Sequence, residues 1–322
     1  MADRKKTFET VYSIEDLVVE SCITIGDVRI IPGGSGLTPW NEAIRKLRDR
    51  DDFESNTKDY LVKEYKKSIK NIMRDKKKSY ASVMFKAERL FDKNEALLKA
   101  DRALDVLRLM QFWFGKYDSS FTSFAIHSSV RSQLLESLTR SDEGLSGGWE
   151  RRGPLIAQTF DKEKIVEMEN WEPYRTICRL VEKKSPDKME KKISAAIAWF
   201  GFATLEYQDH IKLSKLVTAL ESLLSVQQDR DEGRIRANIG ERLAFLLTES
   251  EQLEERRRYI RQWKKIYKTR SKILHGGYTE VDEALLDKAT EFAKDSIISI
   301  VSRQDIKSIE KLQRWHEDMK LR

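Results

Sequence analysis

The chain has 322 residues, of which 40% are hydrophobic and 35% are charged, and it carries a net charge of +7. Its two cysteines lie far apart in the sequence, and its longest apolar run, residues 193–205, is shorter than the roughly 20 residues that a bilayer-spanning helix needs. A disulfide framework and a membrane-spanning helix are therefore excluded. The length suffices for two domains, and the positive charge weakly favours an acidic partner such as nucleic acid.

The sequence predicts a cytoplasmic protein with no membrane partner. Its N-terminus, MADRKK, has no apolar run behind it, so we expect no signal peptide. The cysteines, Cys22 and Cys178, form no CxxC pair, which fits a reducing compartment.

The N-terminal half mixes predicted strands with helices. Residues 12–21 and 22–32 are rich in Val and Ile and end at a Pro-Gly-Gly turn, which is typical of strands. Thr38 then caps a predicted helix with Pro39 at its first position. The charged segment 57–75 is also predicted to be helical.

Further along this half, one helix is strongly indicated. Residues 94–115 place apolar side chains at spacings of three and four, which is the pattern of an amphipathic helix. We expect strands at 79–88 and 120–130. Residues 140–153 are polar and rich in glycine, and this composition favours a loop.

From about residue 161 onward the pattern is helical throughout. The expected helices cover residues 186–208, 212–224, 237–250, 251–275, 281–302 and 305–321. The predicted fold class is therefore an α+β N-terminal domain, residues 1–165, followed by an all-α helical bundle, residues 166–322.

Histidine spacing gives no sign of a metal site. His127, His210, His275 and His316 are scattered, no two of them are four residues apart, and no HExxH motif occurs. A dedicated zinc site is therefore not expected.

Two glycine-rich stretches resemble known motifs only formally. Residues 32–36, PGGSG, lack the GK[ST] ending of a P-loop and the GxGxxG spacing, so a plain turn is favoured. Residues 144–148, GLSGG, match the GxSxG pattern, but a nucleophile elbow needs a hydrophobic strand before it and a helix after it. Polar segments flank this one, which argues against Ser146 as a nucleophile.

The positive charge is concentrated in one segment. Residues 251–275 hold three acidic side chains and nine basic ones: Arg256, Arg257, Arg258, Arg261, Lys264, Lys265, Lys268, Arg270 and Lys272. Such a stripe attracts phosphate groups. The alternative is a solvated helix face whose cations lie near the C-terminus, where the helix dipole favours them.

This basic helix ends in a distinctive stretch, IYKTRSKILHGG, residues 266–277. Gly276 and Gly277 offer a left-handed cap, and the dipole of the helix stabilises the protonated form of His275. A pKa near neutrality suits a group that moves protons. The alternative is a well-capped, solvated helix end, because roughly one Arg–His pair at such a spacing is expected by chance in a chain this basic.

The spacing of Arg270 and His275 poses a geometric problem. At about 100° per residue the two positions differ by about 140° around an ideal helix, so they do not share one face. Either the last turn is distorted, or a second copy of the helix completes the site across a two-fold axis.

These residues together resemble the Apea-like HEPN domains of the HEPN superfamily. The likeness covers residues 190–280 and rests on AIAWFGFA, LSKLVTALESLL, IGERLAFLL and IYKTRSKILHGG. It implies a metal-independent endoribonuclease that acts as a homodimer and needs no cofactor. Arg270 and His275 would be the motif pair, and the products would be a 2′,3′-cyclic phosphate and a 5′-hydroxyl.

The resemblance also implies supporting residues. Ser271 occupies the position after the arginine, where many HEPN nucleases have Asn, Asp or His. Glu221 would orient Arg270 through a bidentate pair, and Arg242 and Tyr267 are further candidates for supporting roles. The expected contacts to the RNA backbone are Lys264, Lys265, Lys268 and Lys272, for which a solvated face is the alternative.

Three functions follow as competing hypotheses. The first is a ribonuclease acting on tRNA or mRNA in bacterial stress response or antiphage defence, with the N-terminal domain as its sensor or regulator. The second is a non-catalytic RNA-binding or scaffolding module. The third is a subunit of a toxin–antitoxin pair or of a larger effector complex, which requires a regulatory partner.

Overall fold

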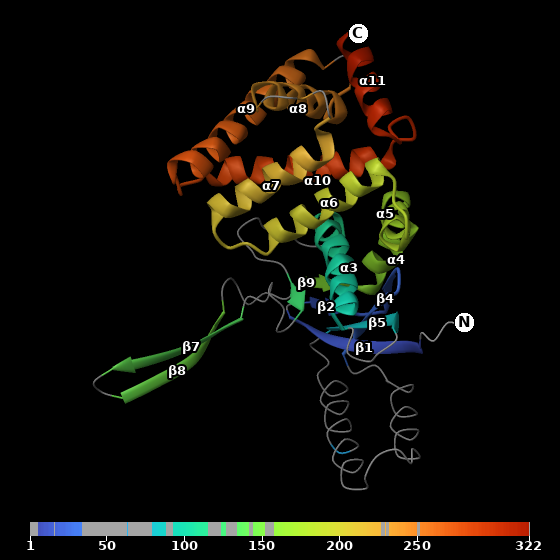
Figure 1. Ribbon diagram of the computed structural model, residues 1–322, viewed down its shortest axis with the longest axis vertical. Helices are drawn as coiled ribbons and strands as arrows, with labels where there is room; N and C mark the ends of the chain where they lie inside the picture. Colours follow the sequence, from blue (N-terminus) through green and yellow to red (C-terminus); the bar gives the residue numbers. More distant parts are fainter. Residues whose placement is uncertain are drawn as a thin grey trace.

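The computed structural model describes residues 6–15, 17–33, 63, 79–87, 93–114, 124–126, 134–141, 144–151, 158–226, 229, 232–249 and 252–321. Within these residues the chain has an α+β N-terminal part followed by a series of helices (Figure 1). This order agrees with the coarse layout predicted from the sequence.

The N-terminal strands form a five-stranded sheet in the order β3-β4-β5-β1-β6. Its members are β1 (Lys6–Glu15), β3 (Ile23–Ile25), β4 (Val28–Pro32), β5 (Ser79–Ala87) and β6 (Ala125–Ile126), and all neighbours run antiparallel. In β3 the two isoleucines are buried and Thr24 between them is exposed, as alternation across a sheet requires. Beside this sheet, β2 (Leu17–Val19) pairs in parallel with β9 (Gln158–Phe160).

Several strand predictions are confirmed and others need correction. The strand expected at 79–88 is β5. Residues 22–32 form two strands, β3 and β4, because Gly26 adopts a φ of 59° and turns the chain back between Ile25 and Val28. Residues 12–21 likewise divide between the end of β1 and β2. Of the strand expected at 120–130, the structure describes β6 and residue 124.

The prediction of a loop at residues 140–153 is wrong. β7 (Leu134–Ser141) and β8 (Gly144–Arg151) form an antiparallel hairpin in which Ser141 lies opposite Gly144. A half-buried strand is recognised in a sequence by alternating apolar and polar residues. This stretch lacks that alternation, so its sequence did not indicate the strands. Ser146 lies in the middle of β8, opposite Thr139, and not at a strand-to-helix turn.

The predicted helix starting with Thr38 and Pro39 lies outside the described residues. Of the helix expected at 57–75, only residue 63 is described, and it is helical.

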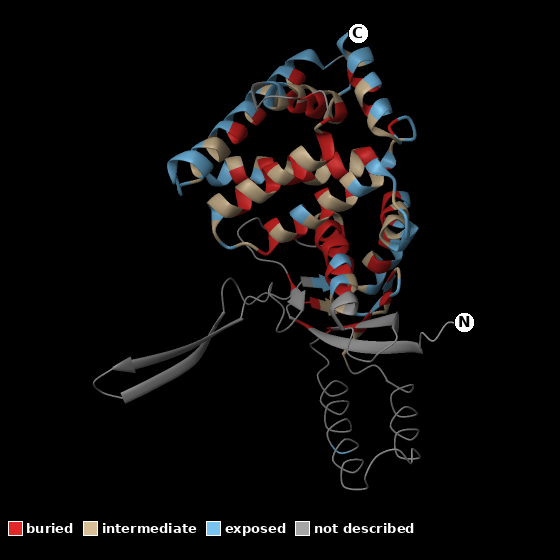
Figure 2. Ribbon diagram, viewed as in Figure 1, coloured by how far each residue is buried: buried red, intermediate tan, exposed pale blue. Residues whose placement is uncertain are grey.

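The predicted long helix in the N-terminal half is confirmed as α3 (Lys93–Phe114). It lies between the sheet and the helices that follow, and residues 103–111 are buried without interruption (Figures 1 and 2). Its buried Arg108 donates hydrogen bonds to Asp105, at 2.6 Å, and to the Phe124 carbonyl just before β6, at 2.8 and 3.0 Å. A helix enclosed on all sides must pair its polar side chains in this way.

The remaining described chain is helical, as predicted. Its helices are α4 (Lys162–Asn170), α5 (Glu172–Glu182), α6 (Lys188–Thr204), α7 (Asp209–Leu224), α8 (Glu232–Leu247), α9 (Leu253–Gly276), α10 (Glu283–Ser302) and α11 (Ile309–Lys320). Side-chain caps fix four of their N-termini: Asp161, Asp187, Asp282 and Ser308 each accept a hydrogen bond from a backbone N–H of the first turn. None of the described helices is long and apolar enough to cross a membrane.

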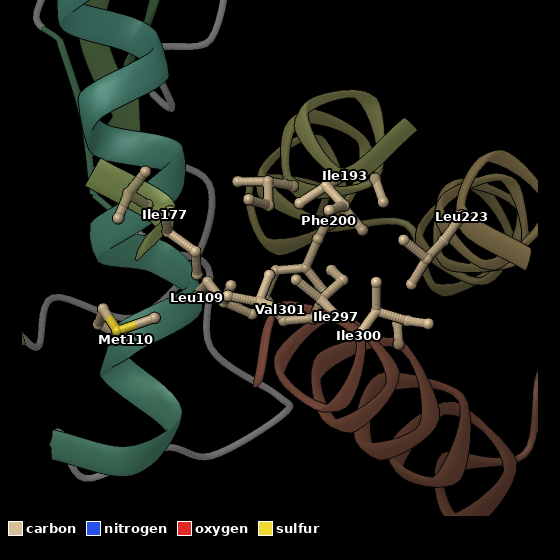
Figure 3. Close-up of a cluster of buried hydrophobic side chains, with 14 of the residues drawn as sticks. Leu109, Met110, Ile177, Ile193, Phe200, Leu223, Ile297, Ile300 and Val301 are labelled. Carbon is tan, nitrogen blue, oxygen red and sulfur yellow. The ribbon is translucent and has the colours of Figure 1, made fainter. Parts of the chain in front are cut away.

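One hydrophobic cluster runs from the sheet through α3 into the helical part. Figure 3 shows Leu109 of α3 next to Val301 of α10, close to Phe200 of α6 and Ile297 of α10. The Phe112 and Phe200 rings meet edge to face with centroids 5.1 Å apart. The expected boundary between residues 165 and 166 stays a prediction, and it falls inside α4, whose Ile165 is buried in this same cluster.

α3 and α6 lie in close contact at Gly201. A Cβ atom at this position would lie 1.9 Å from Asp105 Oδ1, which is far inside van der Waals contact. We therefore expect Gly201→Ala to lower the free energy of unfolding by about 1–3 kcal/mol, as overpacking in a core does. Gly276→Ala is the control, because nothing lies within 4 Å of its Cβ position. Denaturant unfolding of both variants tests this, and equal effects would contradict the assigned crossing.

The C-terminal helix α11 is fixed to α8 by charged groups. His316 Nε2 and Lys320 Nζ lie 3.2 and 2.7 Å from Glu241 Oε2. The hydrogen bond from His316 is the main cause that lowers the pKa of Glu241 to about 2, from an ordinary value of 4.5, while burial opposes the shift. Burial also lowers the pKa of His316.

The depressed pKa of Glu241 predicts acid sensitivity. The ionised carboxylate stabilises the fold fully above about pH 4.5, and this contribution disappears as the pH falls toward about 2, through the pKa of the folded state. Thermal unfolding of wild type and Glu241→Gln across this range should show a stability difference that shrinks on acidification. A difference that stays constant from pH 6 to pH 2 would disprove the linkage.

Candidate functional site

Helix α9 presents two different faces, as its sequence pattern requires. Trp263, Ile266 and Tyr267 are buried, and the Trp263 indole donates a 2.8 Å hydrogen bond to the Arg236 carbonyl on α8. The opposite face is exposed along most of its length (Figure 2). This packing fixes which of the basic side chains meet solvent.

The first two turns of α9 use their cations for structure. Arg256 is buried over the Phe245 ring, at 4.9 Å from its centroid. Arg257 and Arg258 pair with Glu254 and Glu255 of the preceding turn. These three arginines are therefore already engaged within the protein, and the charge count alone overstates how many cations of α9 are free to bind phosphate.

The available positive charge of α9 lies between Arg261 and the C-terminal end of the helix. Exposed there are the four lysines predicted to contact RNA, together with one arginine: Arg261, Lys264, Lys265, Lys268 and Lys272. Lys272 Nζ lies over the Tyr278 ring, 5.6 Å from its centroid. Within the described part of the chain no carboxylate pairs with any of these five cations. A polyanion could therefore approach this surface without first displacing an ion pair.

Arg270 lies between the buried and exposed faces of α9. Its Nη2 is 3.4 Å from Glu221 Oε2 on α7, and the two side chains are only 18% and 22% exposed. Its guanidinium also lies over the ring of Tyr267, 5.6 Å from the centroid. Glu221 and Tyr267 thus both hold Arg270, although the contact with Glu221 is a single long one and not the expected bidentate pair.

The guanidinium of Arg270 retains unused donors. Its Nε is buried and has no hydrogen-bond partner among the described residues. Because Nε is shielded from solvent, only the Nη groups, of which Nη2 contacts Glu221, could donate to an additional acceptor such as a phosphate oxygen.

Tyr267 and Ser271 lie on either side of this arginine along α9. The Tyr267 ring is buried against Trp263, with centroids 5.5 Å apart, so it provides a fixed support for Arg270. Ser271 is half-buried. Ser271 therefore lies beside the site, and no contact to Arg270 assigns it a role.

The end of α9 has the predicted left-handed cap. Gly277 adopts a φ of 62° and a ψ of 21°, and its N–H donates to the Lys272 carbonyl. The Tyr278 N–H approaches the same carbonyl at 3.4 Å. The cap ends the helix immediately after His275 and leaves this histidine in its last turn.

His275 is exposed at this helix end. It makes no hydrogen bond or ion pair with any described residue, and in particular none with Arg270. Its neighbours Leu274 and Tyr278 are 53% and 42% exposed. Within one chain, therefore, Glu221 and Tyr267 hold Arg270 in place, but no described residue holds His275.

The structure places Arg242 away from this group. Arg242 is buried, its Nη1 donates to Asp229 at 2.6 Å and to the Leu224 carbonyl at 2.9 Å, and its Nη2 reaches the other Asp229 oxygen at 3.3 Å. It caps the C-terminus of α7 and does not contact Glu221 or Arg270. Its observed contacts are structural, whereas the resemblance implies a supporting role in the site.

Sequence reasoning did not identify the partners of Arg242. Burial by itself raises the pKa of Asp229, but hydrogen bonds from Arg242, from the Val226 N–H and from Asn238 outweigh it and lower the pKa. Lys192 adds a second cation at this helix end by donating to the Ser222 carbonyl at 2.9 Å. Asp229 lies in a polar linker between two helices, where nothing in the sequence distinguishes it from a solvated residue.

No metal centre occurs in the described part of the chain, where no group of three or more His, Cys, Asp or Glu side chains is arranged to hold an ion. His316 packs against Glu241, His210 is half-buried at the start of α7, and His127 lies outside the described residues. Cys22 and Cys178 are both free and half-buried.

Comparisons with known proteins do not assign a family. No protein-family model matches the sequence, and searches of curated proteins and of solved structures find no significant match. The functional argument therefore rests on the residues and their geometry.

The structural role of Arg242 predicts a large effect on stability. Arg242→Met would leave the buried carboxylate of Asp229 without its cation, so we expect a loss of about 3–5 kcal/mol in the free energy of unfolding. Arg257→Met, which removes an exposed pair with Glu254, should change it by less than about 1 kcal/mol. Urea unfolding measures both variants, and similar losses would argue against the buried network.

Proposed function

We propose that this chain is a metal-independent endoribonuclease of the HEPN type, with Arg270 and His275 as its catalytic pair. The observation that carries the proposal is the contact between Arg270 and Glu221 at 3.4 Å, which holds a guanidinium with unused donors. The resemblance assigns a supporting carboxylate to this position, and the exposed lysines of α9 lie along the same helix.

The two motif residues have complementary chemistry. His275 removes the proton of a ribose 2′-hydroxyl as its oxygen attacks the adjacent phosphorus, or it protonates the departing 5′-oxygen. Arg270 binds the phosphate and stabilises the negative charge that develops on its oxygens. The bond from phosphorus to the 5′-oxygen breaks, which leaves a 2′,3′-cyclic phosphate and a 5′-hydroxyl.

The geometry of a single chain favours completion of the site by a second copy. Positions 270 and 275 are about 140° apart around the helix, and the two side chains do not meet within one chain. A two-fold axis beside the end of α9 would bring the histidine of one protomer toward the arginine of its partner. The exposed side chains of Leu274 and Tyr278 offer apolar surface for that contact.

RNA is the proposed partner, and tRNA or mRNA the proposed substrate. Lys264, Lys265, Lys268 and Lys272 would bind the phosphate backbone without reading sequence. The proposed setting is a cytoplasmic stress or antiphage response in which the N-terminal part senses a signal or restrains the dimer. A subunit role in a toxin–antitoxin pair or effector complex would place that control in another chain.

A second candidate function is RNA binding without cleavage. The exposure of His275 and its lack of contact with Arg270 favour this alternative, because a module that binds only backbone phosphates needs no imidazole at the helix end. Both functions use the same lysines, so measurements of binding alone do not separate them.

Cleavage of labelled total RNA by the full-length protein separates the two functions. We expect His275→Ala and Arg270→Ala each to reduce cleavage by roughly 10²–10⁴-fold, since each removes a group that acts on the reacting atoms. EDTA should have no effect. His210→Ala is the matched control, because this histidine is half-buried on α7 and lies outside the proposed site.

Mapping of the product ends completes the test. Cyclic phosphate and 5′-hydroxyl termini support the proposed reaction, and a shift to other termini would contradict it. Full activity of either motif variant would refute the catalytic assignment. Retarded migration of RNA by wild type, without cleavage, would instead establish the binding module.

A further inference from the structure

A cavity of about 320 Å³ lies between α3, the end of α5 and the first half of α6. Its origin can be traced to helix packing. α3 and α6 are in close contact where Asp105 meets Gly201, and the small side chains of Ser194, Ala195 and Ala198 leave space beside this crossing. The cavity is separate from the end of α9 and shares no residue with the proposed ribonuclease site.

The floor of this cavity is apolar. Leu180 and Val181 from α5, Pro186 before α6, and Ile197 from α6 supply most of it. Cavities of this size with apolar walls and a few polar groups are typical of sites for small ligands.

The rim of the cavity is positively charged. Arg102 from α3 and Lys191 from α6 line it, both are exposed, and neither side chain has a hydrogen bond or ion pair with any described residue. A third cation, Lys183, already pairs with Glu190 at 2.7 Å. Asp105 is the carboxylate among the lining residues, and its charge is neutralised by the buried Arg108 at 2.6 Å.

A larger hollow nearby has a different character. It measures about 470 Å³ and lies between α5, α6 and the connection from α10 to α11. Most charges on its rim are already paired within the protein: Glu172 with Arg179, Lys183 with Glu190, and Arg303 with Asp305. An anion that entered it would have to displace these pairs, whereas the smaller cavity offers two unpaired cations.

We propose that the cavity between α3 and α6 binds a small amphipathic carboxylate. An aliphatic body of the ligand covers the apolar floor formed by Leu180, Val181 and Ile197. The carboxylate lies at the rim, where Arg102 and Lys191 supply charge-assisted hydrogen bonds. The aliphatic body thus covers apolar surface, and the carboxylate pairs with cations that have no partner among the described residues.

Titration calorimetry of the full chain with octanoate tests this assignment. We expect one octanoate per chain. Acetate lacks the apolar body and octan-1-ol lacks the charge, so each should bind at least tenfold more weakly. Equal affinity for octan-1-ol would overturn the proposed anion recognition, and the absence of any saturable octanoate binding would overturn the site.

Variants locate the ligand in this cavity. Arg102→Gln and Lys191→Gln should each weaken octanoate binding at least tenfold, whereas Lys184→Gln, an exposed lysine outside the lining, should leave it unchanged. Ala198→Leu should fill the cavity and abolish binding. Unchanged affinity in both rim variants would overturn the proposal, and this readout does not depend on whether Ala198→Leu folds.

RNA cleavage distinguishes this proposal from the ribonuclease proposal. Arg102→Gln and Lys191→Gln lose octanoate binding but retain the motif residues on α9. Loss of cleavage in His275→Ala with intact octanoate binding therefore shows that the two sites are independent.

Discussion

The close approach of α3 and α6 at Gly201 is the constraint on which much of this molecule depends. The absence of a Cβ atom there lets the Asp105–Arg108 pair lie against α6, and Arg108 in turn reaches the Phe124 carbonyl beside the sheet. α3 is thereby shared by the sheet and the helices, and one hydrophobic cluster continues through both. The same crossing leaves the neighbouring cavity open, because the α6 residues before Gly201 that line it, Ser194, Ala195 and Ala198, have small side chains.

The candidate site depends on how α9 is oriented. Burial of Trp263 and Tyr267 fixes the rotation of the helix, so Arg270 is directed to Glu221 on α7 while the lysines remain exposed. The left-handed cap at Gly277 then ends the helix and leaves His275 at its exposed end. A guanidinium held by the fold and an imidazole left free at a helix end are the features that connect this structure to the proposed two-chain chemistry.

Individual residues show where sequence reasoning succeeded and failed. The periodicity of α3 and α9 was sufficient to place both helices, and two adjacent glycines were sufficient to predict the cap. The hairpin of β7 and β8 was missed because its sequence is polar and carries no alternating pattern. The resemblance implied a supporting role for Arg242, whereas the structure pairs its guanidinium with Asp229 and the Leu224 carbonyl.

The sequence by itself determined that a part with strands precedes a series of helices, the basic character of α9 and the identity of the residues at its end. These properties are local, because they follow from helix periodicity and from the conformational freedom of glycine. Only the tertiary structure decided which partners these residues meet: Glu221 for Arg270, Asp229 for Arg242, and none of the described residues for His275. Such pairings join helices that are distant in sequence, and their geometry depends on how the whole core packs.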